Sequence, residues 1–314
     1  MALPPVLFTA VQTPLAQRLS ARLDASQPIV LDGGMRGALA QAGFDVDQPL
    51  GTAAALGLDS RLVASIHQRF CAAGVHLVRA NTSETTPKAL SRTGYGYRAA
   101  KLSSLAVDLA VSAVEGCGRQ VCVAGVLPPM QGPDDRLRGE QVAHAQRLLS
   151  AGCDVIYIEV VHTLREAVAA TAAAAETGLP VIITLAVNEN GNLSSGESLD
   201  TVCSALSGAG ARGFVAAPSD PAGELRATIE LSGMGRPWGV HCAGRTALSP
   251  NAYGERALAL YEEGATLLGG ESFAGPEHVR ALVGLVPGAE REIRRQTMAP
   301  LGSAGALSNL PPRM

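Results

Sequence analysis

Carboxylates follow two of the short apolar runs of this sequence. Asp32 stands directly before Gly33 and Gly34, whose missing side chains let a ligand approach the backbone closely. In that place Asp32 can accept a hydrogen bond from an amine or a hydroxyl, or it can cap a turn. Glu159 ends the apolar run DVIYIE, where burial of an unpaired carboxylate is costly. We expect Glu159 to face a ligand, and a structural ion pair is the alternative.

Two further acids follow strand-like runs. Glu84 and Glu271 each stand on a loop, the second after a Gly-Gly pair. Together with Asp32 and Glu159 they would make one end of the molecule acidic, which suits a cationic amine or a hard divalent metal such as Mg²⁺ or Mn²⁺. Alternatively, Glu84 turns outward to solvent.

An adjacent histidine and cysteine end another apolar run. Alternation along a strand points His241 and Cys242 to opposite faces, so only one of them can look inward. A Cys–His nucleophile pair is therefore geometrically awkward, and a buried histidine beside a packed cysteine is the other interpretation. The two lysines of the chain, Lys88 and Lys101, lie outside the predicted strands, which disfavours a Schiff-base aldolase.

Short β-branched runs alternate with longer stretches of helical period, the pattern of repeated βα units around a parallel sheet. The predicted strands cover residues 28–31, 75–80, 120–125, 154–159, 180–187, 213–217, 238–242 and 265–269. The predicted helices cover residues 59–73, 99–115, 140–151, 163–176, 198–207, 221–231, 250–263 and 276–285. Eight such units predict an α/β fold, a single-domain (β/α)8 TIM barrel, whose chemistry gathers where the strands end.

The composition fits one domain. We divide the chain into an N-terminal lead-in (1–27), the barrel (28–286) and a C-terminal tail (287–314) that is rich in Arg, Pro, Gly and Ser. The net charge of −3, with scattered basic residues, argues against a nucleic-acid partner. Without a cationic leader or an apolar run of roughly 20 residues, we expect a soluble, cytoplasmic protein with no membrane partner. Six cysteines without CxxC spacing predict reduced thiols.

Taken in order from about Pro28 to Val286, several segments resemble the homocysteine S-methyltransferase family. They are LDGGM, SIHQRFCAAG, ANTSETT, AGCDVIYIEVVHTLREA, SSGESL, LSPNAYGERALALYEEGATLLGG and PEHV, and the most specific stretch covers residues 248–279. The resemblance implies an intracellular barrel that moves a methyl group to the sulfur of homocysteine. The donor would be S-methylmethionine, S-adenosylmethionine, a betaine or a folate, and a bound zinc would convert the thiol to a thiolate.

The resemblance also implies roles for individual residues. It assigns the substrate's ammonium to Asp32 and Glu159, beside the backbone of Gly33 and Gly34. Asn81 and Thr82 match the second-strand motif, and Ser195 and Gly196 match the Ser-Gly after strand five. The predicted substrate-binding set is therefore Asp32, Gly33, Gly34, Asn81, Thr82, Glu84, Glu159, Ser195 and Gly196.

This sequence departs from the family at the zinc ligands. The sixth-strand motif, normally Gly-x-Asn-Cys, reads GFVA and ends at Ala216, and the eighth-strand motif, normally Gly-Gly-Cys-Cys-Gly, reads GGESF. Glu271 and Ser272 occupy the two positions vacated in the eighth strand. The acid of the family's DGGMGTEL is Ala38 here, and the aromatic of its Pro-Leu-Trp is Gly51. We therefore expect no zinc and predict no metal ligand.

Three functions stay open at this point. The first is zinc-independent alkyl (methyl) transfer to a small amino-acid-like substrate, with Glu271 or His241 as general base and Glu271, Ser272, His241 and Cys242 as the catalytic candidates. The second is a lyase, hydrolase or isomerase that uses Glu84, Glu159 and Glu271, with or without Mg²⁺ or Mn²⁺. The third is a pseudoenzyme that binds an amino acid without turnover.

Two further expectations concern the metal and the partners. Cys242, His241 and Glu271 would make an unusual replacement zinc site. The expected partners are the small-molecule substrate and a methyl donor, and a homo-oligomer is left open.

Overall fold

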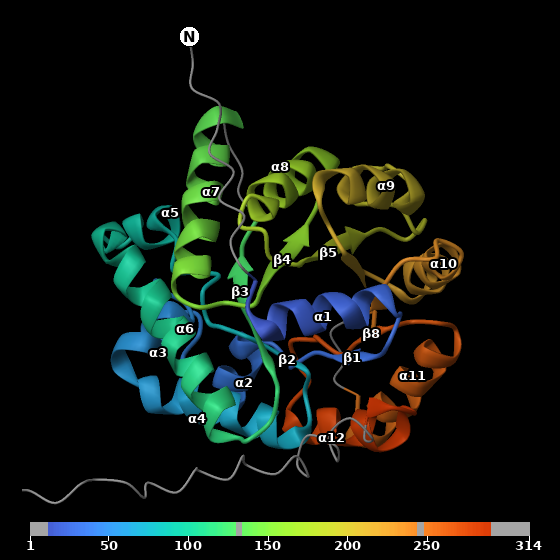
Figure 1. The fold of residues 1–314 in the computed structure, drawn as a ribbon, viewed down its shortest axis with the longest axis horizontal. Coiled ribbons are helices and arrows are strands. Elements are labelled where there is room, and N and C mark those ends of the chain that lie inside the picture. The colour runs from blue at the N-terminus through green and yellow to red at the C-terminus, as the bar shows by residue number, and fades with distance from the viewer. Residues whose placement is uncertain (1–11, 130–133, 244–247, 290–314) are drawn as a thin grey trace, which may run out of the picture.

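Parallel strands alternate with helices along the chain (Figure 1), and the computed structural model describes residues 12–129, 134–243 and 248–289. The strands are β1 Ile29–Val30, β2 Leu77–Arg79, β3 Cys122–Leu127, β4 Val155–Val161, β5 Val181–Val187, β6 Gly213–Pro218, β7 Trp238–Val240 and β8 Leu267–Leu268. β2 to β7 form a six-stranded parallel sheet in sequence order, and β1 pairs with β8 in a two-stranded parallel sheet. The α/β class and all eight predicted strands are thus confirmed, with several strands shorter than expected.

Backbone hydrogen bonds connect the two sheets at both ends. The His76 N–H donates to the Val30 carbonyl at 2.8 Å, and the Asp32 N–H donates to the Leu77 carbonyl at 3.1 Å. On the other side, the Thr266 N–H donates to the Trp238 carbonyl at 2.9 Å. The six-stranded sheet is therefore curled, since its first and last strands both contact the β1–β8 pair.

The helices surround the strands in Figure 1. They are α1 Pro14–Asp24, α2 Met35–Gln41, α3 Ala53–Leu58, α4 Ser60–Ala73, α5 Pro87–Ser91, α6 Ala99–Gly116, α7 Asp134–Ser150, α8 Leu164–Ala175, α9 Leu199–Ala209, α10 Pro221–Ser232, α11 Pro250–Glu262 and α12 Pro276–Leu285. The eight predicted helices are confirmed, although α7 begins six residues earlier than expected. Helices α1, α2, α3 and α5 were not predicted. Side chains of Asp59, Thr163, Ser198, Asp220 and Ser249 cap helix starts by accepting backbone N–H groups.

Alternate strand side chains fill the interior between the strands. The interior cluster contains Ile29, Leu31, Leu77, Cys122, Ala124, Val155, Tyr157, Ile182, Val215 and Leu267. Leu19 and Leu23 of α1 belong to the same cluster, and α1 crosses the strands in Figure 1. The Thr13 hydroxyl, just before α1, donates to Asp154 at the start of β4. The predicted lead-in of residues 1–27 therefore contains a helix that covers the N-terminal ends of the strands.

Shortening a buried leucine of α1 tests that covering role. Leu19 is almost fully buried, so we expect Leu19→Ala to lower the free energy of unfolding by about 2–5 kcal/mol, because it leaves a cavity in the interior cluster. The same substitution at Leu225 of α10, which is 63% exposed, is expected to cost at most about 0.5 kcal/mol. Urea denaturation of both variants measures the difference. Equal losses would mean that α1 does not stabilise the strands.

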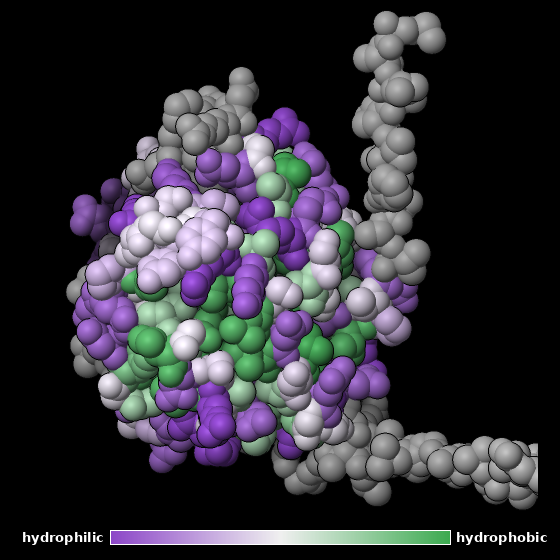
Figure 2. Space-filling model, turned by 90° about the vertical axis from the view of Figure 1, so that its left-hand side faces the viewer, coloured by the Kyte–Doolittle hydropathy of each residue, from purple (hydrophilic) through white to green (hydrophobic). Residues whose placement is uncertain are grey.

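The outer surface is of mixed polarity. Figure 2 shows a face on which hydrophobic residues gather at the centre and hydrophilic residues surround them. In the described part of the chain, no helix combines the length and the apolar character needed to cross a bilayer. All six cysteines are free in the structure. The predicted tail of residues 287–314 lies outside the described residues from residue 290 onward.

Candidate functional site

A cavity of about 390 Å³ opens where the strands end. Its volume lies within the range of roughly 300–1,000 Å³ that is usual for small-ligand pockets. Seven residues singled out in the sequence line it, namely Gly34, Asn81, Thr82, Glu84, Glu159, His241 and Ser272. The side chains of Arg36, Thr52, Arg79, Ser83, Tyr157 and Thr184, which sequence reasoning missed, line it as well. The structure thus brings seven of the thirteen predicted site residues together.

Asp32 lies behind the cavity wall, in a buried ion pair. Its side chain is 2% exposed, and its Oδ1 accepts a hydrogen bond from Arg79 Nε at 2.8 Å. Its Oδ2 accepts the backbone N–H of Arg79 at 2.9 Å. Both carboxylate oxygens therefore have partners, and it is Arg79 that faces the cavity in front of Asp32.

Arg79 is fixed in place from several sides. Its Nη2 donates to the carbonyls of Asp32 and Gly270, each at 2.9 Å, and its guanidinium lies 5.0 Å from the ring centroid of Tyr157. The Tyr157 hydroxyl in turn shares a 2.7 Å hydrogen bond with Thr184. Burial opposes the charge of Arg79, but the carboxylate of Asp32 outweighs that effect and raises the pKa of Arg79 above its ordinary value.

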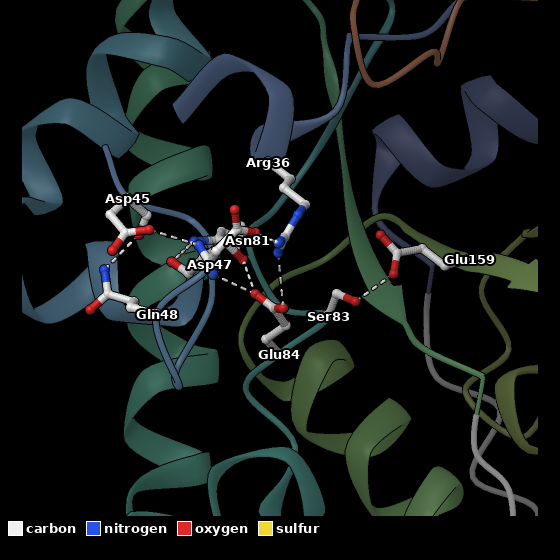
Figure 3. Close-up of polar contacts among 9 residues, drawn as sticks. Arg36, Asp45, Asp47, Gln48, Asn81, Ser83, Glu84 and Glu159 are labelled. Carbon is white, nitrogen blue, oxygen red and sulfur yellow. Dashed lines mark hydrogen bonds and ion pairs between the residues drawn. The ribbon is translucent and has the colours of Figure 1, made fainter. Parts of the chain in front are cut away.

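Glu159 reaches the cavity from the end of β4. Its Oε2 accepts a hydrogen bond from the Ser83 hydroxyl (Figure 3), whereas Oε1 has no hydrogen-bond partner among the described residues. Burial raises the pKa of Glu159, while the Ser83 hydrogen bond and the charge of Arg79 oppose that rise. Glu159 therefore titrates at a higher pH than an ordinary glutamate. Its Oε1 remains available to a ligand.

Glu84 is bonded to the protein at the edge of the cavity, and its side chain stays 35% exposed. Its carboxylate accepts hydrogen bonds from the Thr52 backbone N–H and hydroxyl, the latter at 2.6 Å, and Arg36 lies 3.5 Å away (Figure 3). A side chain on Gly51 would collide with this carboxylate at 2.3 Å, which explains the glycine there. Asn81 contacts the same loop, since its amide donates to the Thr52 carbonyl at 2.9 Å and its Oδ1 lies 2.7 Å from the Thr52 hydroxyl oxygen. Glu84 and Asn81 thus hold the loop against the cavity.

The histidine and cysteine after β7 lie on opposite sides, as alternation predicted. His241 lines the cavity, and its buried Nε2 has no hydrogen-bond partner among the described residues. Burial lowers the pKa of His241, which favours the neutral imidazole. Cys242 does not line the cavity, and its Sγ accepts a hydrogen bond from Arg256 Nε at 3.0 Å. Burial raises the pKa of the Cys242 thiol to about 12, which makes it a poor nucleophile.

Glu271 and Ser272, which stand in the vacated zinc positions, point in different directions. Ser272 lines the cavity, but Glu271 is absent from its lining. One Glu271 oxygen accepts the backbone N–H of Cys242 at 3.2 Å, and the other accepts the hydroxyl of Tyr253 on α11. With both oxygens bonded and a side chain that is nearly buried, Glu271 has a structural environment in place of the ligand-facing one that we expected.

Four predicted substrate-binding residues either contact the backbone of neighbouring segments or lie outside the cavity. Gly33 does not line the cavity, and a side chain there would meet the Ala274 carbonyl oxygen at 1.7 Å, so the glycine permits chain packing and not ligand approach. Thr82 lines the cavity, but its hydroxyl donates to the Val126 carbonyl and accepts the Val126 backbone N–H. Ser195 and Gly196 lie in the loop after β5, outside the cavity lining.

The residues around the cavity do not match a zinc site. None of the six cysteines lines it. Across residues 12–129, 134–243 and 248–289, no group of three His, Cys, Asp or Glu side chains is arranged to hold a metal ion. A zinc site of the usual kind needs three such protein ligands. The three glutamates proposed for a lyase, hydrolase or isomerase do not share one site either. Glu84 and Glu159 line the cavity, whereas Glu271 does not.

The inward-pointing residues that we missed follow a simple rule. Leu77 of β2 belongs to the interior cluster, so the period of two places Arg79 on the same inward face. Tyr157 of β4 belongs to the cluster as well, so Glu159 faces inward for the same reason. The same alternation from Ile182 in β5 points Thr184 inward. The strand pattern could therefore have identified Arg79, Tyr157 and Thr184, had every alternate position been followed to the strand end.

Comparison with known proteins gives a consistent result. A family model described as homocysteine S-methyltransferase matches residues 29–286. The crystal structure of the homocysteine methyltransferase MmuM from Escherichia coli, in its metallated form, is similar with a TM-score of 0.74 and 21% identity, covering 85% of this chain and 99% of that one. Its oxidised form gives a TM-score of 0.74, 20% identity and coverages of 85% and 98%. No curated protein sequence matches the chain.

Proposed function

Because the chain belongs to the homocysteine S-methyltransferase family, we propose that it transfers a methyl group to a small amino-acid-like acceptor without the help of zinc. The observation that carries this proposal is the placement of Glu159. Its carboxylate faces a cavity of suitable size and has one oxygen without a partner among the described residues. That oxygen can bind the ammonium group of an amino acid.

We further propose that the strands form a closed eight-stranded barrel. The hydrogen bonds from the β1–β8 pair to the segments of β2 and β7 support closure on both sides. The structural similarity to MmuM also supports it. Closure matters for the function, because it brings the ends of β2, β4 and β7 around one cavity.

The chain's own residues can carry the proposed chemistry. Glu159 holds the acceptor's ammonium, and the neutral imidazole of His241 accepts the proton that leaves the acceptor's nucleophilic atom. The nucleophile's electron pair forms the bond to the methyl carbon as the donor's bond to that carbon breaks. Of the two predicted bases, His241 is favoured over Glu271, because only His241 lines the cavity.

Zinc independence is supported by the absence of cysteines from the cavity wall and of any three-ligand set among the described residues. A thiol that is not bound to a metal reacts mainly as the small thiolate fraction. We therefore expect selenohomocysteine, whose selenol is more acidic than a thiol, to be a better acceptor than homocysteine. A requirement for Mg²⁺ or Mn²⁺ stays a separate prediction.

The test is a methyl-transfer assay with isotopically labelled methyl donors. Purified protein is incubated with labelled S-methylmethionine, S-adenosylmethionine or glycine betaine, and with homocysteine or selenohomocysteine, before and after dialysis against a chelator. We expect a labelled product that survives chelation. Loss of activity on chelation with recovery by Zn²⁺ would contradict zinc independence. Recovery by Mg²⁺ or Mn²⁺ would support a requirement for one of these divalent metals.

The same assay separates the alternative functions. Substrate loss without any labelled product would favour a lyase, hydrolase or isomerase. Binding of an amino acid without turnover would favour a pseudoenzyme. The acidic cluster that a lyase, hydrolase or isomerase would need is not assembled in the described cavity.

The acid side of the pH profile tests the role of Glu159. Only its deprotonated form attracts an ammonium, and burial raises its pKa, so kcat/KM should fall with decreasing pH already above the ordinary glutamate range. The Ser83 hydrogen bond opposes the rise in pKa. We therefore expect Ser83→Ala to move the acid limb to higher pH. A limb that Ser83→Ala leaves in place would assign it to another group.

A further inference from the structure

We infer that Arg79 binds the carboxylate of the substrate, so that the cavity recognises a zwitterion between Arg79 and Glu159. This inference rests on the proposed amino-acid-like acceptor and names its second charged anchor. Asp32, which the family resemblance assigned to the ammonium, is withdrawn from that role because its side chain is 2% exposed and does not line the cavity.

The hydrogen-bond geometry of the guanidinium leaves one nitrogen available. An arginine side chain has five N–H groups. Nε donates to Asp32 Oδ1, and Nη2 donates to the carbonyls of Asp32 and Gly270. Nη1 has no hydrogen-bond partner among the described residues, and Arg79 lines the cavity. Two N–H groups of a charged donor therefore remain for an oxygen acceptor.

The position of Arg79 is also preorganised. The guanidinium is held by Asp32 at one edge, by Gly270 at another, and by the ring of Tyr157 at 5.0 Å. A donor that is already fixed loses little conformational entropy when it binds a ligand. A residue needed only to neutralise Asp32 would not have to present its third nitrogen to a cavity.

The charges around the cavity favour a zwitterion over a simple anion. Asp32 and Arg79 form a buried ion pair, and at the exposed side Arg36 pairs with Asp47 at 2.7 Å and lies 3.5 Å from Glu84. Glu159 is left with a hydroxyl, Ser83, as its hydrogen-bond partner. A ligand with an ammonium at Glu159 and a carboxylate at Arg79 Nη1 leaves each charge facing an opposite one. A ligand that carries only a negative charge would leave Glu159 facing a like charge.

Three probes separate the two anchors. L-Methionine carries both charged groups, L-methioninamide lacks the carboxylate, and N-acetyl-L-methionine lacks the ammonium. Isothermal titration calorimetry measures the affinity of each for the intact protein. We expect methioninamide to bind about tenfold more weakly than methionine or worse, since a charge-assisted hydrogen bond is lost. Comparable affinities for these two ligands, or no binding of any probe, would overturn the inference.

The variants assign the carboxylate to one arginine. Arg79→Met is combined with Asp32→Asn, so that no buried carboxylate is left without its partner. In the double variant we expect the preference for methionine over methioninamide to disappear, while the penalty for N-acetylation persists. Arg36→Met is the matched variant at the second arginine of the cavity, and it should retain the preference. Loss of the preference in Arg36→Met, with retention in the double variant, would refute the assignment.

The outcome is independent of the methyl-transfer assay. If no donor and acceptor pair gives a labelled product but the Arg79-dependent preference is present, the proposed function fails and the carboxylate anchor stands. If methyl transfer occurs equally well with acceptors that have and lack a carboxylate, the function stands and the anchor fails. Thermal unfolding of each variant, followed by circular dichroism, shows that it is folded before titration.

Discussion

Glu159→Gln is expected to lower kcat/KM for the amino-acid acceptor by at least about 30-fold. The substitution keeps the shape of the side chain but removes the charge that faces the substrate's ammonium. Truncating one member of a buried, hydrogen-bonded charge pair costs about 2–5 kcal/mol, and each 1.4 kcal/mol corresponds to a factor of about ten. Steady-state kinetics with the acceptor identified by the methyl-transfer assay measures the loss.

A glutamate on the surface provides the control for that substitution. Glu176 pairs with Arg138 on the outside of the molecule, where both side chains are largely exposed. Glu176→Gln should therefore leave kcat/KM within about twofold of the wild type. In Glu159→Gln the part of the acid limb that Glu159 causes, which Ser83→Ala moves, should also disappear, because that titrating group is gone. Full activity of Glu159→Gln would remove the main support for an amino-acid acceptor.

Much of the fold could be predicted because its signals are local. The period of two marked the strands, and capping residues such as Asp59, Ser198 and Ser249 marked helix starts that the structure reproduces. The four missed helices carry weaker signals. Helices α2, α3 and α5 have seven, six and five residues, too short for a clear periodicity. Helix α1 is long enough, but it lies before the first strand, where the repeated βα pattern gave no reason to expect a helix.

The site was harder to predict, because the direction of a side chain after a strand end depends on tertiary partners. Alternation held for one pair that directly follows a strand, since His241 and Cys242 after β7 lie on opposite sides. Glu271 follows two glycines with positive φ, so no periodicity governs it, and Tyr253 from a distant helix determines where its carboxylate points. The family resemblance identified the position of Asp32 but could not reveal its partner, since Arg79 is not part of any motif that we compared.

Arg79→Met is expected to lower the free energy of unfolding by about 3–5 kcal/mol, the usual effect of removing one partner from a buried ion pair. Asp32 is 2% exposed and Arg79 is 10% exposed, so the substitution leaves a largely buried carboxylate without its partner. The backbone N–H of Arg79 still donates to Asp32 Oδ2 in the variant, and this bond limits the loss. Urea denaturation, which reports the midpoint and slope separately, measures the change.

Two comparisons decide whether burial of the pair causes that loss. Arg138→Met makes the same substitution in the exposed pair with Glu176, where about 1 kcal/mol or less is expected. Adding Asp32→Asn to Arg79→Met removes the unpaired charge and should restore part of the stability, because a neutral amide is far less costly to bury than a carboxylate. An equal loss in Arg79→Met and Arg138→Met would mean that the Asp32 charge is solvated or protonated. In that case the rigid guanidinium on which the carboxylate anchor depends would not exist.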